Sequence, residues 1–452
     1  MERLIVDKLA DWKESKHRKP LILKGVRQVG KTWALKEFGK LHYENVAYFN
    51  FDESDEYKQF FETTKDVSRI LQNLIMASGQ KIKPHETLII FDEIQESNKA
   101  LNTLKYFCEN APEYHVACAG SLLGITLSKP SSFPVGKVDF LDVLPMSFTE
   151  FLTANGDSHF VSYMDSVNDF SPIPDAFFNP LYEKLKMYFV TGGMPESVRS
   201  WTSDRDVDLV QQSLLNILTA YERDFAKHSE KKDFPKLSLI WKSIPSQLAR
   251  ENKKFIYKAV KDGARAREYE DALQWLCDAA LVKKIYRSTA PGIPLSAYDD
   301  LSAFKLYLVD VGLLRRLSLL SPTAFGEGNR LFAEFKGALS ENYILQALAG
   351  QTEAVARYWA TEHPRYEVDY IIQHDNEIIP IEVKSESNVE SISLKKYKEK
   401  YGDKVRLRVR FSMQNIRMDG DVLNIPMFMA DHANRLIELA LEKTAPMSIT
   451  TA

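Results

Sequence analysis

The sequence has little of what marks secreted or membrane proteins. Only three cysteines occur in 452 residues, and Cys108, Cys118 and Cys277 lie far apart without paired spacing. This scarcity excludes a disulfide framework or a zinc knuckle and favours a reducing compartment. No segment reaches the roughly 18 apolar residues that a membrane span needs, and the first 20 residues hold no apolar core of signal-peptide length. We therefore expect a cytoplasmic protein without membrane contact.

A strong excess of one charge is also missing. The chain has 59 Lys and Arg against 62 Asp and Glu, a formal net charge of -3. Proteins that bind nucleic acid over their whole surface are usually more basic, so any such binding must be local. A composition of 44% hydrophobic and 27% charged residues is typical of a globular chain, long enough here for two to four domains.

A glycine-bracketed turn follows the first apolar run. Residues 20–24 predict a short buried strand, and the next eight residues, GVRQVGKT, fill every fixed position of the phosphate-loop pattern. Glycines let successive backbone N–H groups point at phosphate oxygens, and a helix that begins near Thr32 directs its positive end to the same place. We expect Lys31 to neutralise the β- and γ-phosphates and Thr32 to ligate magnesium. The predicted ATP-binding residues of this turn are Gly25, Val26, Arg27, Gln28, Val29, Gly30, Lys31 and Thr32.

A second apolar strand, predicted over 86–91, ends in Asp92 and Glu93. We expect Asp92 to hold the magnesium ion with its water shell, and Glu93 to orient or deprotonate an attacking water. A further strand at 115–119 leads to Ser121, which we predict to sense the γ-phosphate. One more predicted strand between the two motifs suits the ATPase branch of phosphate-loop folds, so the expected ligand is ATP.

Five ordered motifs resemble those of the prokaryotic AAA-type ATPases that carry a C-terminal domain of unknown function. They are GVRQVGKT (25–32), IIFDEIQE (89–96), LPMSFTEFL (144–152), TGGMPE (191–196) and KLYLVDVGLL (305–314). The resemblance covers nearly the whole chain. It implies a domain architecture but no biological role, because the role of that family is poorly defined. Its members often have an arginine where this chain has Lys137, which keeps the charge of an arginine finger but not its planar fork. The alternative for Lys137 is a solvated surface lysine.

The middle of the chain predicts helices from 147 to 224 and then a basic segment. Between residues 231 and 270 the chain has 11 Lys or Arg against 5 Asp or Glu. A helix and two strand-like stretches follow, which gives the helix, helix, β-hairpin order of a winged helix that would contact duplex DNA. A protein-docking or merely solvated face is the alternative. Arg223, at the end of the helical stretch, either reaches a phosphate or forms an ion pair on the helix surface.

The C-terminal part predicts a helix followed by a strand and a β-hairpin, over 333–350, 355–360, 366–373 and 377–384. Asp369 lies in one hairpin strand, and Glu382 and Lys384 lie two residues apart, on the same face, in the next. This set resembles the PD-(D/E)xK nuclease fold, and Glu341 stands on the preceding helix where that fold commonly supplies a further acid. The resemblance implies that Asp369, Glu382 and Glu341 bind Mg²⁺ or Mn²⁺ while Lys384 positions or activates water.

Two alternatives to cleavage stay open for this part of the chain. The resembled fold also serves as a binding module that does not cut. A structural salt bridge between Asp369 and Lys384 would account for the same residues without any chemistry.

Together these patterns predict an α/β fold in four parts: an AAA-type ATPase domain with a parallel sheet flanked by helices (1–155), a helical lid or linker (156–230), a winged-helix-like domain (231–328) and an α+β restriction-endonuclease-like domain (329–452). The expected function is Mg²⁺-dependent ATP hydrolysis that couples nucleotide state to a DNA-binding or DNA-cleaving module. The alternative is an ATP-driven switch that docks or remodels a protein partner. A homo-oligomer is expected if a neighbouring copy completes the ATP site.

Overall fold

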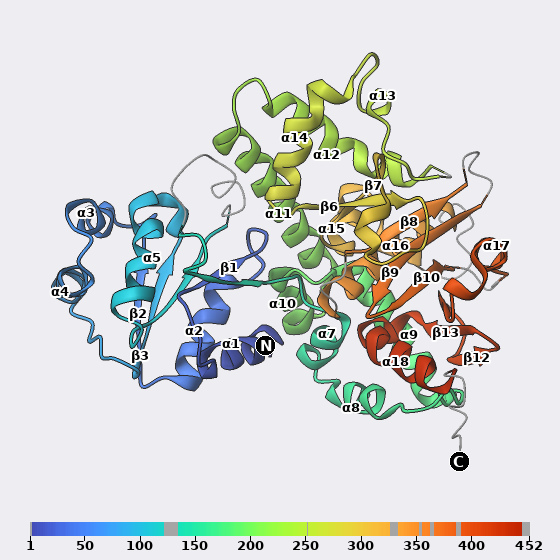
Figure 1. Cartoon of the computed structure of the whole chain (residues 1–452), viewed down its shortest axis with the longest axis horizontal. Coiled ribbons are helices and arrows are strands. Elements are labelled where there is room, and N and C mark those ends of the chain that lie inside the picture. The colour runs from blue at the N-terminus through green and yellow to red at the C-terminus, as the bar shows by residue number, and fades with distance from the viewer. Residues whose placement is uncertain are drawn as a thin grey trace. The chain divides into compact units, whose positions relative to one another are not determined.

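A computed structural model of the chain describes residues 2–121, 134–250, 252–325, 333–351, 355–361, 366–385 and 390–444. The chain divides into two compact units (Figure 1). The first unit is Met1–Pro145 with Gln274–Leu281, and the second unit is Met146–Leu273 with Val282–Ala452. No helix of the described residues is long and apolar enough to cross a membrane.

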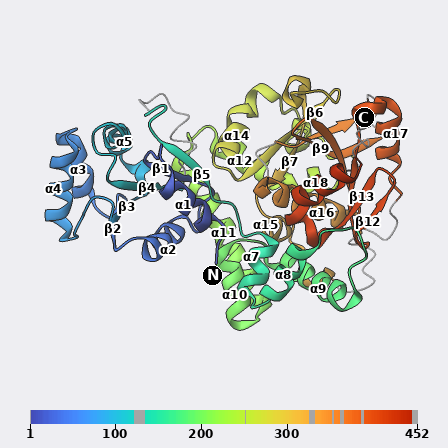
Figure 2. The same cartoon turned by 60° about the horizontal axis from the view of Figure 1, so that its bottom comes forward.

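The first unit is built on a five-stranded parallel sheet. The strand order is β2-β3-β4-β1-β5, and every neighbouring pair runs parallel (Figure 2). The central strands read as apolar runs because helices bury both of their faces. The parallel sheet predicted for this part of the chain is confirmed. Its strands are β1 (Leu21–Lys24), β2 (Asn45–Asn50), β3 (Thr87–Asp92), β4 (His115–Ala119) and β5 (Asp139–Asp142).

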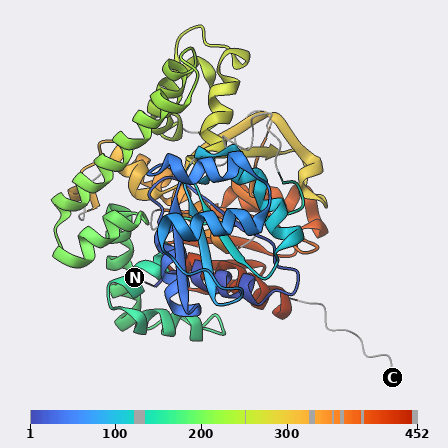
Figure 3. The ribbon, with the colours of Figure 1, turned by 90° about the vertical axis from the view of Figure 1, so that its left-hand side faces the viewer.

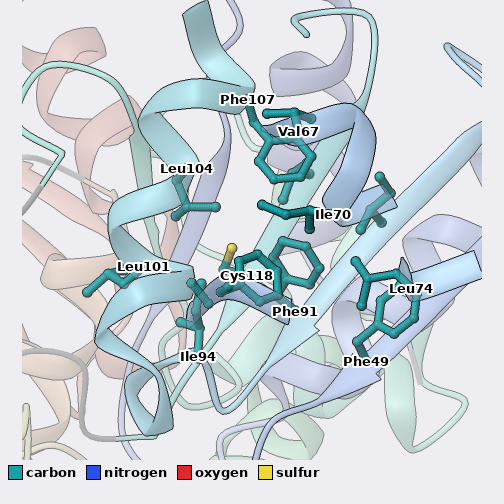
Figure 4. Packing of buried hydrophobic residues seen from close by; sticks show 14 of the residues in the cluster. Phe49, Val67, Ile70, Leu74, Phe91, Ile94, Leu101, Leu104, Phe107 and Cys118 are labelled. Atoms are coloured by element: carbon teal, nitrogen blue, oxygen red, sulfur yellow. The ribbon is translucent and has the colours of Figure 1, made fainter. Parts of the chain in front are cut away.

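Helices cover both faces of this sheet. They are α1 (Ile5–Glu14), α2 (Lys31–His42), α3 (Asp55–Thr63), α4 (Val67–Ser78) and α5 (Asn98–Asn110). Figure 3 views the unit from the side of α3 and α4. On one face, Phe91 and Cys118 pack with Ile70 of α4 and Leu104 of α5 in a single buried cluster (Figure 4). On the other face α2 approaches so closely that a Cβ on Gly39 would lie 2.5 Å from Cγ2 of Val46.

The second unit begins with helices, as predicted. They are α7 (Phe148–Ala154), α8 (Ser158–Ser166), α9 (Asp175–Thr191), α10 (Pro195–Asp204) and α11 (Val207–His228). The first of them starts at a capping box, in which Ser147 and Glu150 bond each other's backbone N–H groups. Next come α12 (Phe234–Leu248), α13 (Tyr257–Val260), α14 (Ala266–Asp278) and α15 (Val311–Leu317). The part of α14 from Gln274 onward is assigned to the first unit.

An eight-stranded mixed sheet forms the centre of the second unit (Figure 1). Its order is β12-β13-β11-β10-β9-β8-β6-β7. The strands are β6 (Val282–Ser288), β7 (Asp299–Leu308), β8 (Arg357–Ala360), β9 (Glu367–His374), β10 (Glu377–Val383), β11 (Arg408–Ser412), β12 (Arg417–Asp419) and β13 (Val422–Pro426).

The predicted hairpin after the basic segment exists, but it does not stand alone. Strands β6 and β7 pair antiparallel, and β6 also meets β8 at Arg287 and Tyr358. A hairpin edge left open would present unpaired backbone groups, and the pairing with β8 covers that edge. The predicted boundary between residues 328 and 329 therefore does not separate two sheets.

The C-terminal hairpin lies close to its expected bounds. Strands β9 and β10 pair antiparallel from Glu377 with His374 to Ile381 with Tyr370, and β10 pairs in parallel with β11. Helix α17 (Ile392–Tyr401) packs on the sheet through Leu394, while α16 (Ala333–Gln351) accepts a hydrogen bond from the Tyr370 hydroxyl at its backbone. Helix α18 (Ala433–Lys443) ends the described chain.

Gly25→Ala should destabilise the first unit more than an ordinary glycine replacement. Gly25 has φ 143°, and an added Cβ would lie 2.3 Å from the carbonyl oxygen of Val143. Gly79→Ala is the control because Gly79 also has positive φ (66°), with nothing within 4 Å of its Cβ position. Backbone strain alone costs about 1–2 kcal/mol, and the Gly25 variant should lose at least about 3 kcal/mol. Denaturant unfolding measures both; equal losses would contradict the close approach.

Candidate functional site

The loop between β1 and α2 has the backbone of an anion-binding turn. Gly25, Gln28 and Gly30 have positive φ values of 143°, 64° and 95°, so the chain curls within a few residues. Gly30 immediately precedes the first residue of α2. Backbone N–H groups at the start of a helix attract phosphate, which makes the loop suited to bind a nucleotide.

Lys31 is buried beside this loop, with 6% of its surface exposed. Its Nζ donates to the carbonyl oxygens of Gly25 and Val26, at 2.9 Å each. Burial lowers the pKa of Lys31 to about 8, although the nearby carboxylates of Glu93 and Asp92 raise it. Neutral carbonyls are weaker partners for an ammonium group than phosphate oxygens, so a bound triphosphate would attract Lys31 away from them.

Thr32 and Asp92 are in direct contact. The Thr32 hydroxyl donates to Oδ2 of Asp92 at 2.9 Å, and the Tyr48 hydroxyl donates to the same oxygen at 2.8 Å. Asp92 ends β3 and is 4% exposed. Hydroxyl and carboxylate oxygens are the donors that Mg²⁺ prefers, so these two side chains fit a magnesium ion. When bound with ATP, that ion would neutralise charge on the phosphates.

Glu93 and Ser121 also lie together. The Ser121 hydroxyl donates to Oε2 of Glu93 at 3.1 Å, its backbone N–H approaches the same oxygen at 3.3 Å, and Gln95 donates to it as well. Glu93 has φ 49°, a left-handed conformation that non-glycine residues adopt mainly where function or tight packing requires it. The predicted base and the predicted sensor are therefore direct neighbours.

Two supporting residues escaped the sequence analysis. The Arg3 guanidinium donates to the carbonyl oxygen of Val29 in the loop at 3.1 Å and to that of Leu144 at 2.7 Å. Gln95 holds the Glu93 carboxylate. No local pattern marks Arg3, whereas Gln95 belongs to the quoted motif IIFDEIQE and could have been considered.

Lys137 and Arg223 lie on surfaces. Lys137 Nζ pairs with Oε1 of Glu109 at 2.9 Å, and both side chains are about two-fifths exposed, at 42% and 38%. Such an exposed pair adds little stability, because water and salt screen it. Arg223 lies exposed on α11. Lys137 thus has a surface position, and Arg223 lies on the helix surface where the alternative placed an ion pair.

The C-terminal candidates are brought to the same part of the second unit. Glu341 on α16 and Glu382 on β10 are buried, at 3% and 4% exposed. Oδ2 of Asp369 on β9 accepts the backbone N–H of Val383 at 2.8 Å. Lys384 Nζ pairs with Oε1 of Glu382 at 2.6 Å, so the salt bridge that Lys384 forms is with Glu382 and not with Asp369 as the structural alternative supposed.

Two lysines that the sequence analysis did not single out complete this group. Lys253, from the segment between α12 and α13, forms an ion pair with Glu341, 88 positions away. Lys305, on β7 and fully buried, forms one with Glu367. The Tyr307 hydroxyl donates to Oε2 of Glu341 at 2.8 Å. We call Lys253, Lys305, Glu341, Glu367 and Asp369 the buried charge cluster.

Electrostatics couple its members. Burial, followed by the negative charge of Glu341, raises the pKa of Asp369 to about 8. Burial would also raise the pKa of Glu341, but the ammonium groups of Lys253 and Lys305 outweigh it and hold that pKa below its usual value. Burial lowers the pKa of Lys253, but the carboxylates of Glu341 and Asp369 raise it by more, so the net result is a raised pKa.

The cluster does not have the form of a metal site. Within the described part of the chain, no group of three or more His, Cys, Asp or Glu side chains is placed to hold a metal ion. The two oxygens of Glu341 bond Lys253 and Tyr307, and Asp369 accepts from the Val383 backbone. Oε2 of Glu382 is buried without a hydrogen-bond partner in the structure. The predicted Mg²⁺ or Mn²⁺ site of Glu341, Asp369 and Glu382 does not fit this arrangement, because lysines pair with Glu341 and Glu382 and the Val383 N–H occupies an oxygen of Asp369.

Comparison with protein families assigns part of the chain. Residues 17–152 match a family described as AAA domain. Residues 182–324 and 336–428 match two domains of unknown function, DUF8612 and DUF4143. The curated proteins provide no match. The phosphate loop, Asp92 and the parallel sheet all lie within the part of the chain that matches the AAA domain.

Solved structures show only distant likeness. A Walker-type ATPase of Pyrococcus abyssi shares 14% identity over 69% of this chain and 94% of that chain, with a TM-score of 0.44. The Aeropyrum pernix ORC1 protein in complex with DNA shares 14% identity over 70% and 90%, with a TM-score of 0.26. The Thermotoga maritima RuvB Holliday junction branch migration motor shares 14% over 64% and 90%, with a TM-score of 0.29. Scores this low carry no argument about function.

Lys31→Ala should abolish ATP binding while the fold persists, because the loop loses the charge that meets the phosphates. In the unmodified protein, ATP affinity should fall as pH rises through about 8, where Lys31 loses its proton. Titration of a fluorescent ATP analogue across pH 6.5 to 9.5 measures both effects, with circular dichroism as the fold control. Retained affinity in the variant would contradict the assignment of the loop.

Proposed function

We propose that the first unit binds ATP with magnesium and hydrolyses it. The observation that carries this proposal is the convergence of three pairs of groups at one edge of the sheet: Lys31 on its loop, Thr32 with Asp92, and Glu93 with Ser121. The carboxyl ends of parallel strands are where open α/β sheets bind ligands. The AAA domain match over residues 17–152 supports the same activity.

Each residue of this set has a separate task. Lys31 would leave the carbonyl groups of its own loop and bind the β- and γ-phosphates. Thr32 and Asp92 would hold the magnesium ion. Glu93 would accept a proton from the attacking water. Ser121 now donates to Glu93, and a γ-phosphate would compete for that hydroxyl, which would release the carboxylate only when ATP is bound.

Glu93→Gln should separate binding from hydrolysis. An amide cannot accept the proton of the attacking water, so turnover should fall about 10²- to 10⁴-fold, while ATP affinity stays within about threefold because the loop is untouched. Glu96→Gln is the matched control, since Glu96 is exposed in the same motif. Phosphate release and ATP titration are the measurements. Equal turnover in all three proteins would point to ATP storage without a hydrolytic role for Glu93.

For the second unit we propose a nuclease-like fold that binds DNA but does not cut it. The paired strands β9 and β10, with Asp369 on one and Glu382 and Lys384 at the end of the other, support the likeness to the PD-(D/E)xK fold. The ion pairs of Glu341 with Lys253 and of Glu382 with Lys384 argue against catalysis, because lysines engage two of the three predicted metal ligands. ATP turnover would then act as a switch on what this unit binds.

DNA contact is proposed for the winged-helix-like part. The order α12, α13, α14 and the hairpin of β6 and β7 supports this proposal. Four cations on or beside α13 and α14 are exposed: Lys258, Lys261, Arg265 and Arg267. An exposed cation group of this kind supplies the sequence-independent part of DNA binding.

Duplex DNA should bind at low salt and stay intact. Fluorescence anisotropy of a labelled duplex should show affinity that falls as salt rises, with a smaller salt dependence in a variant with all four exposed cations replaced by alanine. Plasmid incubated with the protein and Mg²⁺ or Mn²⁺, with and without ATP, should remain uncut by both the wild type and Asp369→Ala.

Two outcomes would change this proposal. Metal-dependent nicking by the wild type that disappears in Asp369→Ala would restore the cleavage hypothesis. No DNA binding at low salt would favour the alternative in which the ATP-driven switch docks a protein. The Glu93→Gln variant with bound ATP should then capture that protein partner, because it binds ATP without hydrolysing it.

A further inference from the structure

We propose that Lys253 and Lys305 take the electrostatic place of divalent cations in the second unit, and that Lys253 keeps its carboxylate cluster closed to metal ions. This inference gives a cause for the proposed absence of cleavage. Its test uses neither DNA nor ATP, so either proposal can fail without the other.

Charge balance is the first argument. Burial of a carboxylate is unfavourable unless an opposite charge or several hydrogen bonds compensate for the lost water. Glu341 and Glu367 each have a lysine partner, Lys253 and Lys305 respectively. Asp369 is satisfied differently, because its Oδ2 accepts the backbone N–H of Val383 at 2.8 Å. Two ammonium groups thus compensate two of the three carboxylates in the cluster, which leaves little negative charge to attract a metal ion.

The second argument is that the backbone holds Lys253 in place. Phe255 N–H donates to the carbonyl oxygen of Phe304 on β7 at 2.8 Å, which ties the segment to the sheet. The side chain of Gln247 bonds both backbone groups of Ile256, at 3.0 Å each. Lys253 itself has φ 48°, a left-handed conformation that is unfavourable for a lysine. A surface lysine would not need this support, so the segment delivers the ammonium group to Glu341.

The two lysines differ in how they could be removed. Lys305 lies inside a strand, is 0% exposed and stands over the ring of Tyr358 at 4.9 Å from its centroid. Lys253 reaches the cluster from a connecting segment, and 17% of its side chain is exposed. Replacing Lys253 with an uncharged residue should therefore leave the sheet folded and allow a cation to reach the carboxylates.

The experiment measures Mn²⁺ binding by nucleotide-free full-length protein, with electron paramagnetic resonance of free Mn²⁺ as the readout. Lys253→Met keeps the length of the side chain and removes its charge. Lys258→Met is the matched control, because Lys258 is exposed on α13. We expect Lys253→Met to bind one more Mn²⁺ ion than the wild type and the control do, with an affinity for that ion at least about tenfold higher than theirs. Its thermal midpoint should rise as Mn²⁺ is added. Adding Asp369→Asn to Lys253→Met should remove both effects.

The opposite results overturn the inference. Mn²⁺ bound by the wild type and lost in Asp369→Asn would show that the cluster already accepts a cation. A folded Lys253→Met with no additional Mn²⁺ would show that Lys253 is not what excludes it. If Lys253→Met folds only when Mn²⁺ is present, the inference is supported, and if Mn²⁺ fails to restore an unfolded variant, it is overturned.

Discussion

A buried ammonium group has to meet negative charge or several oxygen acceptors, and both units of this chain are organised around that requirement. In the first unit Lys31 is satisfied by two carbonyl oxygens of its own loop. In the second unit Lys305 and Lys253 are satisfied by Glu367 and Glu341. Because desolvation of a charge is expensive, each arrangement fixes the strands and loops that supply the partners.

The two solutions lead to different chemistry. Carbonyl groups hold Lys31 weakly enough to be replaced by phosphate, so the site is ready for an anionic ligand that brings its own charge. Carboxylates hold Lys253 and Lys305 strongly, so their site is already neutral. We therefore expect ligand binding at Lys31, whose carbonyl partners can be replaced by phosphate. We expect a structural role for Lys253 and Lys305, whose carboxylate partners are not readily replaced.

The sequence predicted the first unit well because its signals are local. The fixed positions around Lys31 and the acidic strand end at Asp92 each specify a turn or strand end by themselves. The second cluster was predicted only in part. Asp369 and Glu341 were predicted from the resemblance of the hairpin and its preceding helix to the nuclease fold. Lys253 was not, because it belongs to a basic segment that suggested a solvated or DNA-binding face, and its partner Glu341 lies 88 positions away. Lys305 did leave a signal, a lone charge within the apolar run AFKLYLV, which indicates burial with a partner.

The joining of β6 and β8 could not be foreseen either. A single registered pair, Arg287 with Tyr358, links a hairpin that looked like an independent module to the C-terminal strands. Pairing between strands so far apart leaves no periodicity in the sequence, because it depends on which edges remain open after each part has folded.

The most direct test of this account is an experimental structure with a non-hydrolysable ATP analogue and Mn²⁺, in which anomalous scattering locates the metal. The account predicts one manganese peak beside Thr32 and Asp92, with Lys31 moved onto the phosphates, and Lys253 still paired with Glu341. A manganese peak between Asp369 and Glu382, or a loop that leaves the phosphates unbound, would contradict it.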